Sequence, residues 1–224
     1  MNRHFHTELE KLKKMILALG AMVEDRVYQA TLAIETMDIG ISQRIIISDQ
    51  DIDDREVEIE EECLKILALY QPVAVDLRFI VAVIKINNDL ERIGDQAVNI
   101  AERVATMSKQ DRCDFFFDYS NMAKKAQFML KQSLDALVNL DIDLALEVVT
   151  LDDSVDNIKR DAYDRIKAAM ADHPHQIGYL INLLLVSRHI ERLADHATNI
   201  AEEVIYLVEG EIVRHKGAIQ GGVK

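Results

Sequence analysis

The sequence ERIGDQAVNIAE at residues 91–102 recurs as ERLADHATNIAE at residues 191–202, one hundred positions later. Eight of the twelve positions are identical, whereas two unrelated segments of this length would share about one. The repetition extends further, because Met37-Asp38-Ile39 and Leu140-Asp141-Ile142 lie 103 positions apart. Small changes of offset between the copies are what loops of different length would produce. The sequence therefore predicts an internal duplication.

Residues that form turns are rare in this chain, which has 8 glycines and 2 prolines in 224 residues. Long segments without them favour helices, and few aromatic residues and no Asn-Gly or Asp-Gly turns disfavour sheets. Pro72 and Pro174, 102 positions apart, are each expected to end a helix. An all-α fold is predicted, with helices at about 7–36, 42–69, 75–107, 120–139, 144–171 and 177–209.

The duplication and the helices together predict a tandem repeat of two three-helix bundles, with six long antiparallel helices. The first repeat would span residues 1–110 and the second residues 115–216. A polar stretch at 108–114 is interpreted as the linker between them. The tail at 217–224 is expected to be disordered.

One face of each duplicated helix carries apolar residues at alternating steps of four and three. This spacing is typical of a seam that packs against neighbouring helices, so these residues are predicted to be buried. The seam consists of Ile86, Leu90, Ile93, Ala97, Ile100, Val104 and Met107, and of Val186, Ile190, Leu193, Ala197, Ile200, Val204 and Leu207.

The formal net charge of −13 argues against a nucleic-acid-binding protein and against docking on anionic lipid, and it suits cations or basic protein surfaces. No apolar run is long enough to span a membrane, and no signal peptide is expected. Cys63 and Cys113 stand apart, so neither a disulfide framework nor a zinc ribbon is expected. The cytoplasm is the expected location.

The residues Glu91, Asp95, Asn99 and Glu102 fall on one arc of about 80°, roughly opposite the seam, and their copies share the same arc. A solvated outer face is the simplest interpretation for a single helix. Like charges at i,i+4 repel by a few tenths of a kcal/mol, however, and here the pattern occurs twice in register. A bound cation would turn that repulsion into ligation.

Carboxylates are also spaced at i,i+4 in the second and fifth predicted helices, at Asp49 and Asp53 and at Asp152 and Asp156. In the second helix the acidic residues lie between two apolar flanks, where burial without a partner would be costly. Two interpretations stay open: a metal site, or ion pairs with arginines such as Arg78 and Arg92.

The fifth helix departs from the second, because Lys159 and Tyr163 stand where the second helix has Glu56 and Glu60. If both halves bind metal, the second site is therefore expected to be weaker or differently built.

Motifs of the common enzyme classes are missing. The chain has no phosphate-binding Gly-rich loop, no nucleophile elbow and no HExxH, and it lacks the Glu-x-x-His pairs of di-iron bundles. His189 and His196 are seven residues apart, too far to share one ion, and are interpreted as surface residues. No enzymatic activity is predicted.

At these residues the chain resembles the PhoU family of phosphate-specific transport regulators. The resemblance is carried by QPVA at 71–74 with DLR at 76–78, by LERIGD at 90–95 and by IERLAD at 190–195. It covers nearly the whole chain, from about Phe5 to His215.

The resemblance implies two three-helix bundles, a cytoplasmic location and frequent homodimers. It also implies a multinuclear metal cluster, of iron or zinc, with manganese and magnesium still open because carboxylates accept all four. The metal ligands implied by the matching motif positions are Asp49, Asp53, Glu91, Asp95, Asp152, Asp156, Glu191 and Asp195.

The family's role implies that this chain represses the phosphate-starvation response by linking two partners. These are the ATPase of the high-affinity phosphate ABC transporter and a membrane sensor histidine kinase. The 72–78 stretch has no good second copy, which leaves the two halves free to serve different partners. A carboxylate-based metal storage protein and an accessory to a low-affinity phosphate permease are the alternatives.

Overall fold

The computed structural model describes residues 3–110, 114–115 and 117–210, which form seven α-helices and one short 3-10 helix but no strand. None of the described helices is long and apolar enough to cross a membrane. The predicted tail at 217–224 and part of the predicted linker lie outside the described residues. The helices are α1 (Arg3–Thr36), α2 (Ile39–Ile47), α3 (Gln50–Tyr70), α4 (Ala74–Met107), α5 (Tyr119–Asn139), α6 (Ile142–Asp172), η1 (Pro174–Gln176) and α7 (Ile177–Glu209).

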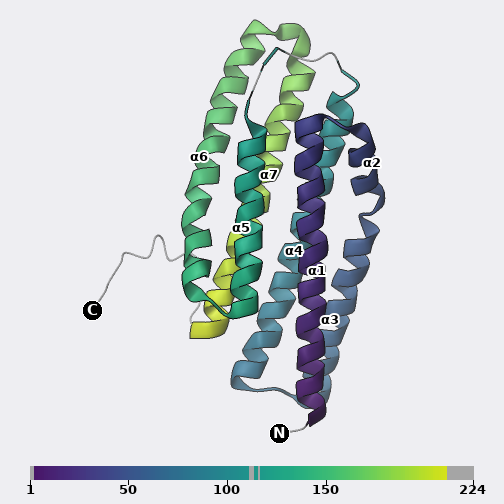
Figure 1. The fold of residues 1–224 in the computed structure, drawn as a ribbon, viewed down its shortest axis with the longest axis vertical. Coiled ribbons are helices and arrows are strands. Elements are labelled where there is room, and N and C mark those ends of the chain that lie inside the picture. The colour runs from purple at the N-terminus through teal and green to yellow at the C-terminus, as the bar shows by residue number, and fades with distance from the viewer. Residues whose placement is uncertain (1–2, 111–113, 116, 211–224) are drawn as a thin grey trace, which may run out of the picture.

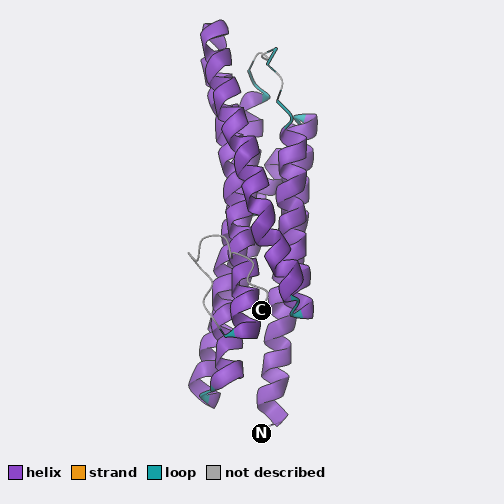
Figure 2. Ribbon diagram, turned by 90° about the vertical axis from the view of Figure 1, so that its left-hand side faces the viewer, coloured by secondary structure: helices purple, strands orange, loops and turns teal. Residues whose placement is uncertain are grey.

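Helices α4 and α7, which carry the duplicated sequence, run antiparallel at the centre of an elongated bundle (Figure 1). The first-half helices α1, α2 and α3 pack on α4, and the second-half helices α5 and α6 pack on α7. Helix α1 also contacts α5, so the halves meet along two pairs of helices. The bundle is slender when it is turned to the side (Figure 2).

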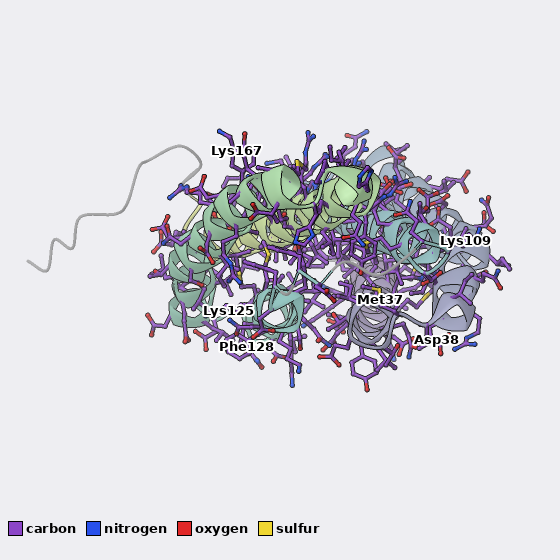
Figure 3. The ribbon with its side chains drawn as sticks, turned by 90° about the horizontal axis from the view of Figure 1, so that it is seen from above. Met37, Asp38, Lys109, Lys125, Phe128 and Lys167 are labelled. Atoms are coloured by element: carbon purple, nitrogen blue, oxygen red, sulfur yellow. The ribbon has the colours of Figure 1, made fainter. Side chains whose placement is uncertain are left out.

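The view down the long axis separates two sides of the bundle (Figure 3). Lys125 and Phe128 of α5 lie on the same side as Met37 at the end of α1, and Lys167 of α6 lies on the opposite side.

The repeated Asp of the Met-Asp-Ile and Leu-Asp-Ile motifs begins a helix in each half. The Asp38 carboxylate accepts hydrogen bonds from the backbone N–H of Gly40 at 2.6 Å and of Ile41 at 3.1 Å. In the second half, Asp141 accepts from the N–H of Leu144 at 3.1 Å. Such caps satisfy N–H groups that the first helical turn leaves unpaired. This part of the repeat is therefore explained by local structure.

The predicted seam is confirmed, because all its residues are buried and Leu207 is the most exposed of them at 6%. The buried apolar residues of both halves form one continuous core. Burying a side chain such as Leu90 or Ile93 contributes about 1.5–3 kcal/mol. Gly20 lets α1 approach α5, since a Cβ there would lie 2.9 Å from a methyl carbon of Leu134.

The helix predicted at 42–69 is wrong in one respect, because the chain breaks at Ser48 and Asp49 into α2 and α3. We attribute the break to Arg26 of α1, a buried side chain whose Nη2 donates to the Ser48 carbonyl at 2.5 Å. The equivalent position in the second half, 103 residues later, is the buried Met129, whose side chain has no hydrogen-bond donor. Helix α6 accordingly runs without a break.

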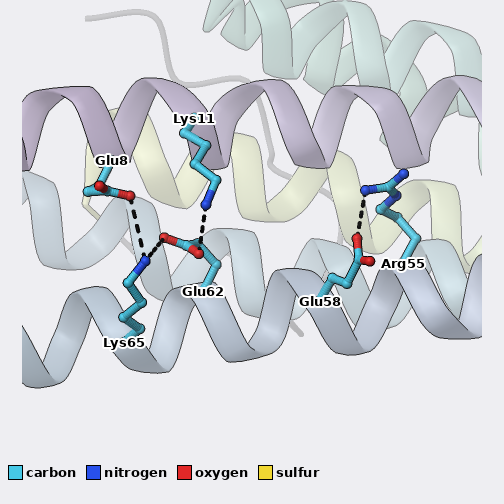
Figure 4. A network of polar contacts seen from close by, with 6 residues as sticks. All are labelled: Glu8, Lys11, Arg55, Glu58, Glu62 and Lys65. Carbon is cyan, nitrogen blue, oxygen red and sulfur yellow. Dashed lines mark hydrogen bonds and ion pairs between the residues drawn. The ribbon is translucent and has the colours of Figure 1, made fainter.

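An ionic network holds α3 against α1 (Figure 4). The buried Glu62 of α3 accepts from Lys11 Nζ at 2.9 Å and from Lys65 Nζ at 3.0 Å, and Lys65 Nζ lies 3.9 Å from Glu8. Burial acts to raise the pKa of Glu62, but hydrogen bonds from the two lysines outweigh it and lower that pKa. The network helps to fix the face that α3 turns toward α4.

Candidate metal centre

The first group of predicted ligands lies where α3 packs against α4. Asp49 and Asp53 flank the start of α3, and Glu91 and Asp95 are one turn apart on α4. All four side chains are half-buried. Burial raises the pKa of Asp49, and the charges of Asp53 and Asp95 raise it further. We call these four residues the first carboxylate cluster.

Few positively charged side chains pair with the first carboxylate cluster. Arg26 Nη1 lies 3.5 Å from Asp49 Oδ1, and Arg92 Nε lies 3.4 Å from Glu91 Oε2. This Glu91 oxygen is buried and accepts no hydrogen bond. Asp53 and Asp95 have no hydrogen bond or ion pair with any residue that the structure describes. Free carboxylate oxygens in this setting are suited to a hard cation.

Of the arginines considered from the sequence, Arg92 borders this cluster, but Arg78 does not. The Arg78 guanidinium lies against Gly210 at the end of α7, within 3.5 Å of where a Cβ would stand. Arg26 was missed, because nothing in the sequence near position 26 marks it as a partner of α3.

The second group of predicted ligands is brought together in the same way, by α6 and α7. Asp152 and Asp156 lie on α6, and Glu191 and Asp195 lie on α7. Burial raises the pKa of Asp195 to about 6, and the charges of Glu191 and Asp152 add to the effect. We call these four residues the second carboxylate cluster.

In the second carboxylate cluster, three of the four carboxylates form an ion pair or a hydrogen bond with another side chain of the same chain. Lys159 Nζ contacts Glu191 Oε1, and Arg160 Nη2 lies 3.3 Å from Asp156 Oδ2. Thr198 Oγ1 donates to Asp152 Oδ1 at 3.2 Å. A cation entering this cluster would have to displace these contacts.

Neither cluster is assembled as a closed coordination sphere. Within residues 3–110, 114–115 and 117–210, no three His, Cys, Asp or Glu side chains are arranged to hold a metal ion. The carboxylates would therefore have to turn toward a cation. The donor set of the first cluster fits that role, because its ligands are all oxygens and include a buried oxygen of Glu91 that accepts no hydrogen bond.

The acidic arc on α4 is not the outer face that the sequence suggested. Glu91, Asp95, Asn99 and Glu102 are all half-buried, because α2 and α3 pack on this helix. The apolar pattern in the sequence predicts which face of α4 is buried most deeply. It does not predict that other helices also partly cover the opposite face.

Two equivalent polar contacts join the halves and were not predicted. His196 Nδ1 lies 2.9 Å from Asp89 Oδ1, and His189 Nδ1 lies 2.9 Å from Gln96 Oε1. Asp89 and His189 are 100 positions apart, as are Gln96 and His196, so the two contacts are related by the duplication. The interpretation of both histidines as surface residues is wrong, because both rings are half-buried between α4 and α7.

Asp195→Asn is expected to stabilise the metal-free protein near neutral pH. Because the folded-state pKa of Asp195 is about 6, above its ordinary value of 3.8, its charge destabilises the fold above pH 6. That penalty disappears as the pH falls from 6 toward 4. We expect a gain of about 1 kcal/mol, or about 2–4 °C in the midpoint, after allowing for solvent screening.

Thermal unfolding in chelator-treated buffer checks this, at about pH 7.5 and again at about pH 4.5, where the gain should be clearly smaller. Asp164→Asn, at an exposed aspartate of α6, is the control. An equal gain at both pH values would contradict the assignment.

The chain is similar to known proteins over nearly its whole length. The sequence model described as the PhoU domain matches twice, at residues 16–104 and 119–204, which confirms the duplication. The phosphate-specific transport system accessory protein PhoU homolog of Pseudomonas aeruginosa is 38% identical over 97% of this chain and 90% of its own length. The PhoU protein of Escherichia coli K12 is 31% identical over 97% of this chain and 92% of its own length.

Two solved structures share the fold. The crystal structure of PhoU from Pseudomonas aeruginosa superposes with a TM-score of 0.90 and 38% identity, covering 92% of this chain and 100% of that one. The phosphate transport system regulatory protein PhoU from Streptococcus pneumoniae gives a TM-score of 0.82 at 30% identity, covering 93% of this chain and 99% of that one. The predicted all-α tandem fold is confirmed.

Proposed function

Since this chain belongs to the PhoU family, we propose that it is an accessory protein of phosphate-specific transport that represses the phosphate-starvation response when phosphate is plentiful. The observation that carries the proposal is the match to the Pseudomonas aeruginosa relative, which extends over 97% of this chain. That relative's name gives it a role in phosphate-specific transport. Both copies of the PhoU domain are present in this chain, at residues 16–104 and 119–204.

The proposed mode of action is that of a cytoplasmic adaptor without catalytic activity. It would bind the ATPase of the high-affinity phosphate ABC transporter and a membrane sensor histidine kinase. A net charge of −13 favours association with basic partner surfaces, chiefly by speeding their encounter. Charge alone does not make such a complex tight, so the affinity has to come from apolar side chains that are buried in the interface.

Three exposed apolar residues that lie close together in the chain, at one end of the bundle, support such contacts. Val73, Val75 and Leu77, between the end of α3 and the first turn of α4, are 74%, 59% and 39% exposed. We call these three residues the entry patch. Clustered exposed apolar side chains are typical of protein interaction sites. The patch falls in the 72–78 stretch that has no good second copy, which fits a contact made by the first half alone.

A bound metal ion is the second element of the proposal. Asp49, Asp53, Glu91 and Asp95 would hold it, as an iron or zinc cluster or as manganese or magnesium. The metal would supply positive charge between α3 and α4. Because the ligands come from both helices, the metal would hold the start of α3 against the middle of α4. The repulsion among the four carboxylates would be replaced by the attraction of each carboxylate to the metal.

Binding to the purified transporter ATPase tests the adaptor proposal. Replacing all three residues of the entry patch by serine is expected to weaken binding by roughly tenfold or more, because interface centres carry most of the affinity. The control replaces Val57 and Leu64 of α3 by serine, since these are exposed to a similar extent, 50% and 56%. Equal binding by both variants, measured by biolayer interferometry, would rule out the entry patch as the contact.

A further inference from the structure

We propose that Lys159 takes the place of a metal ion in the second carboxylate cluster, so that this chain holds metal in its first half only. This inference rests on the metal site proposed for the first half. It concerns the one residue at which the two clusters differ most in charge.

The register of the duplication places Lys159 at the position of Glu56, 103 residues earlier, and Tyr163 at the position of Glu60. Glu56 is half-buried beside the first carboxylate cluster. Burial raises the pKa of Glu56, and the charges of Glu60 and Asp53 raise it further. The first half therefore adds a carboxylate where the second half has an ammonium group.

The contacts of Lys159 are those of an internal counter-ion. Its Nζ contacts Glu191 Oε1. Burial raises the pKa of Asp195, and the positive charge of Lys159 offsets part of that rise. Arg160 pairs with Asp156 at 3.3 Å on the same cluster. Glu191, Asp195 and Asp156 thus each feel a nearby positive charge from α6 itself.

An ammonium group in this position opposes metal binding in two ways. It holds a carboxylate oxygen that the metal would need, and its positive charge repels a divalent cation at close range. Displacing it would leave a half-buried Lys159 without its partner, which adds a desolvation penalty. Neither obstacle exists at Glu56, where a cation would relieve crowding among negative charges.

Reciprocal exchange of these two residues tests the inference, with Mn²⁺ alone as the probe. The starting chain carries Asp53→Asn and Asp95→Asn, which disrupt the first cluster, and we expect it to bind Mn²⁺ only weakly. Adding Lys159→Glu to it is expected to create a site, tightening Mn²⁺ binding by roughly tenfold or more because ligand charge sets affinity at carboxylate sites. In the otherwise intact chain, Glu56→Lys is expected to weaken binding by a similar factor.

Equilibrium dialysis and the electron paramagnetic resonance signal of free Mn²⁺ give the affinities, and circular dichroism verifies that each variant is helical. Lys159→Met removes the charge without supplying a ligand and should gain less than Lys159→Glu. If Lys159→Glu is poorly folded without metal, a rise in its thermal midpoint on adding Mn²⁺, larger than that of Lys159→Met, reports the same site.

Three results separate the possibilities. If the starting chain binds Mn²⁺ as tightly as the unmodified protein, the second cluster holds metal despite Lys159 and the inference is overturned. If Lys159→Glu gains no binding over Lys159→Met, the inference is overturned as well. If the unmodified protein binds no Mn²⁺ but Lys159→Glu does, the proposed first-half site fails while the role of Lys159 stands.

Discussion

Arg26→Met is expected to lower the free energy of unfolding by about 2–3 kcal/mol, because it removes a buried charge that is both hydrogen-bonded and paired. The Arg26 side chain is 8% exposed, yet it carries a charge that bonds to the Ser48 carbonyl at 2.5 Å and pairs with Asp49 at 3.5 Å. Burial lowers the pKa of Arg26, and the carboxylates of Asp49 and Asp51 act against that shift. Removing the guanidinium leaves the Ser48 carbonyl with the backbone N–H of Asp51, at 3.3 Å, as its donor, and it leaves Asp49 without its counter-ion, so that Arg92 alone still pairs with the first carboxylate cluster.

Methionine is the appropriate replacement, because the second half has Met129 at the equivalent position and packs it without exposure. The loss measured for Arg26→Met therefore reports the polar contacts more than a packing defect. Urea unfolding followed by circular dichroism gives the free energy of unfolding. Arg26→Lys is the variant that keeps the positive charge but loses the planar guanidinium group with its several N–H donors. A loss below about 0.5 kcal/mol would show that the bond to Ser48 does not maintain the break between α2 and α3.

The bundle itself could be predicted because its signals are periodic and local. The seam on α4 and α7 repeats every seven residues, and the bounds expected for the last helix, 177–209, agree with α7. Few turn residues and two repeated aspartate caps mark the remaining ends. Such features depend on neighbours in the chain, which the sequence displays directly.

The break between α2 and α3 could not be predicted, because it depends on a bond between residues 22 positions apart. Ser48 and Asp49 are compatible with a helix, and the side-chain bond to which we attribute the turn comes from Arg26 on another element. The contacts between the histidines and α4 have the same origin, since they join residues 93 and 107 positions apart. They could have been suspected from the register of the duplication, which pairs Asp89 with His189 and Gln96 with His196.

The candidate metal centre was predicted in part. Spacing alone placed the carboxylates on shared helical faces, and the structure brings each set of four together. What spacing could not provide is the set of counter-ions, because Arg26 comes from α1. The difference at Lys159 was visible in the sequence, but its contact with Glu191 required the packing of α6 against α7.

Deleting the gene is expected to raise expression of phosphate-starvation genes in phosphate-rich medium to the level normally reached during starvation. A repressor has its largest effect when phosphate is abundant, because only then does it act. The gene for the unmodified chain should restore low expression. The gene for the entry-patch variant should not, while the Val57 and Leu64 control variant should restore it, since only the entry patch is proposed to contact a partner.

The most direct test of the central claim is secreted phosphatase activity of the deletion strain in phosphate-rich medium, with and without the intact gene. High activity that the intact gene returns to a low level is the predicted result. Activity that stays low after deletion would contradict the repressor role. An altered metal tolerance in the same strain would then favour metal storage, and impaired low-affinity phosphate uptake would favour an accessory to a permease.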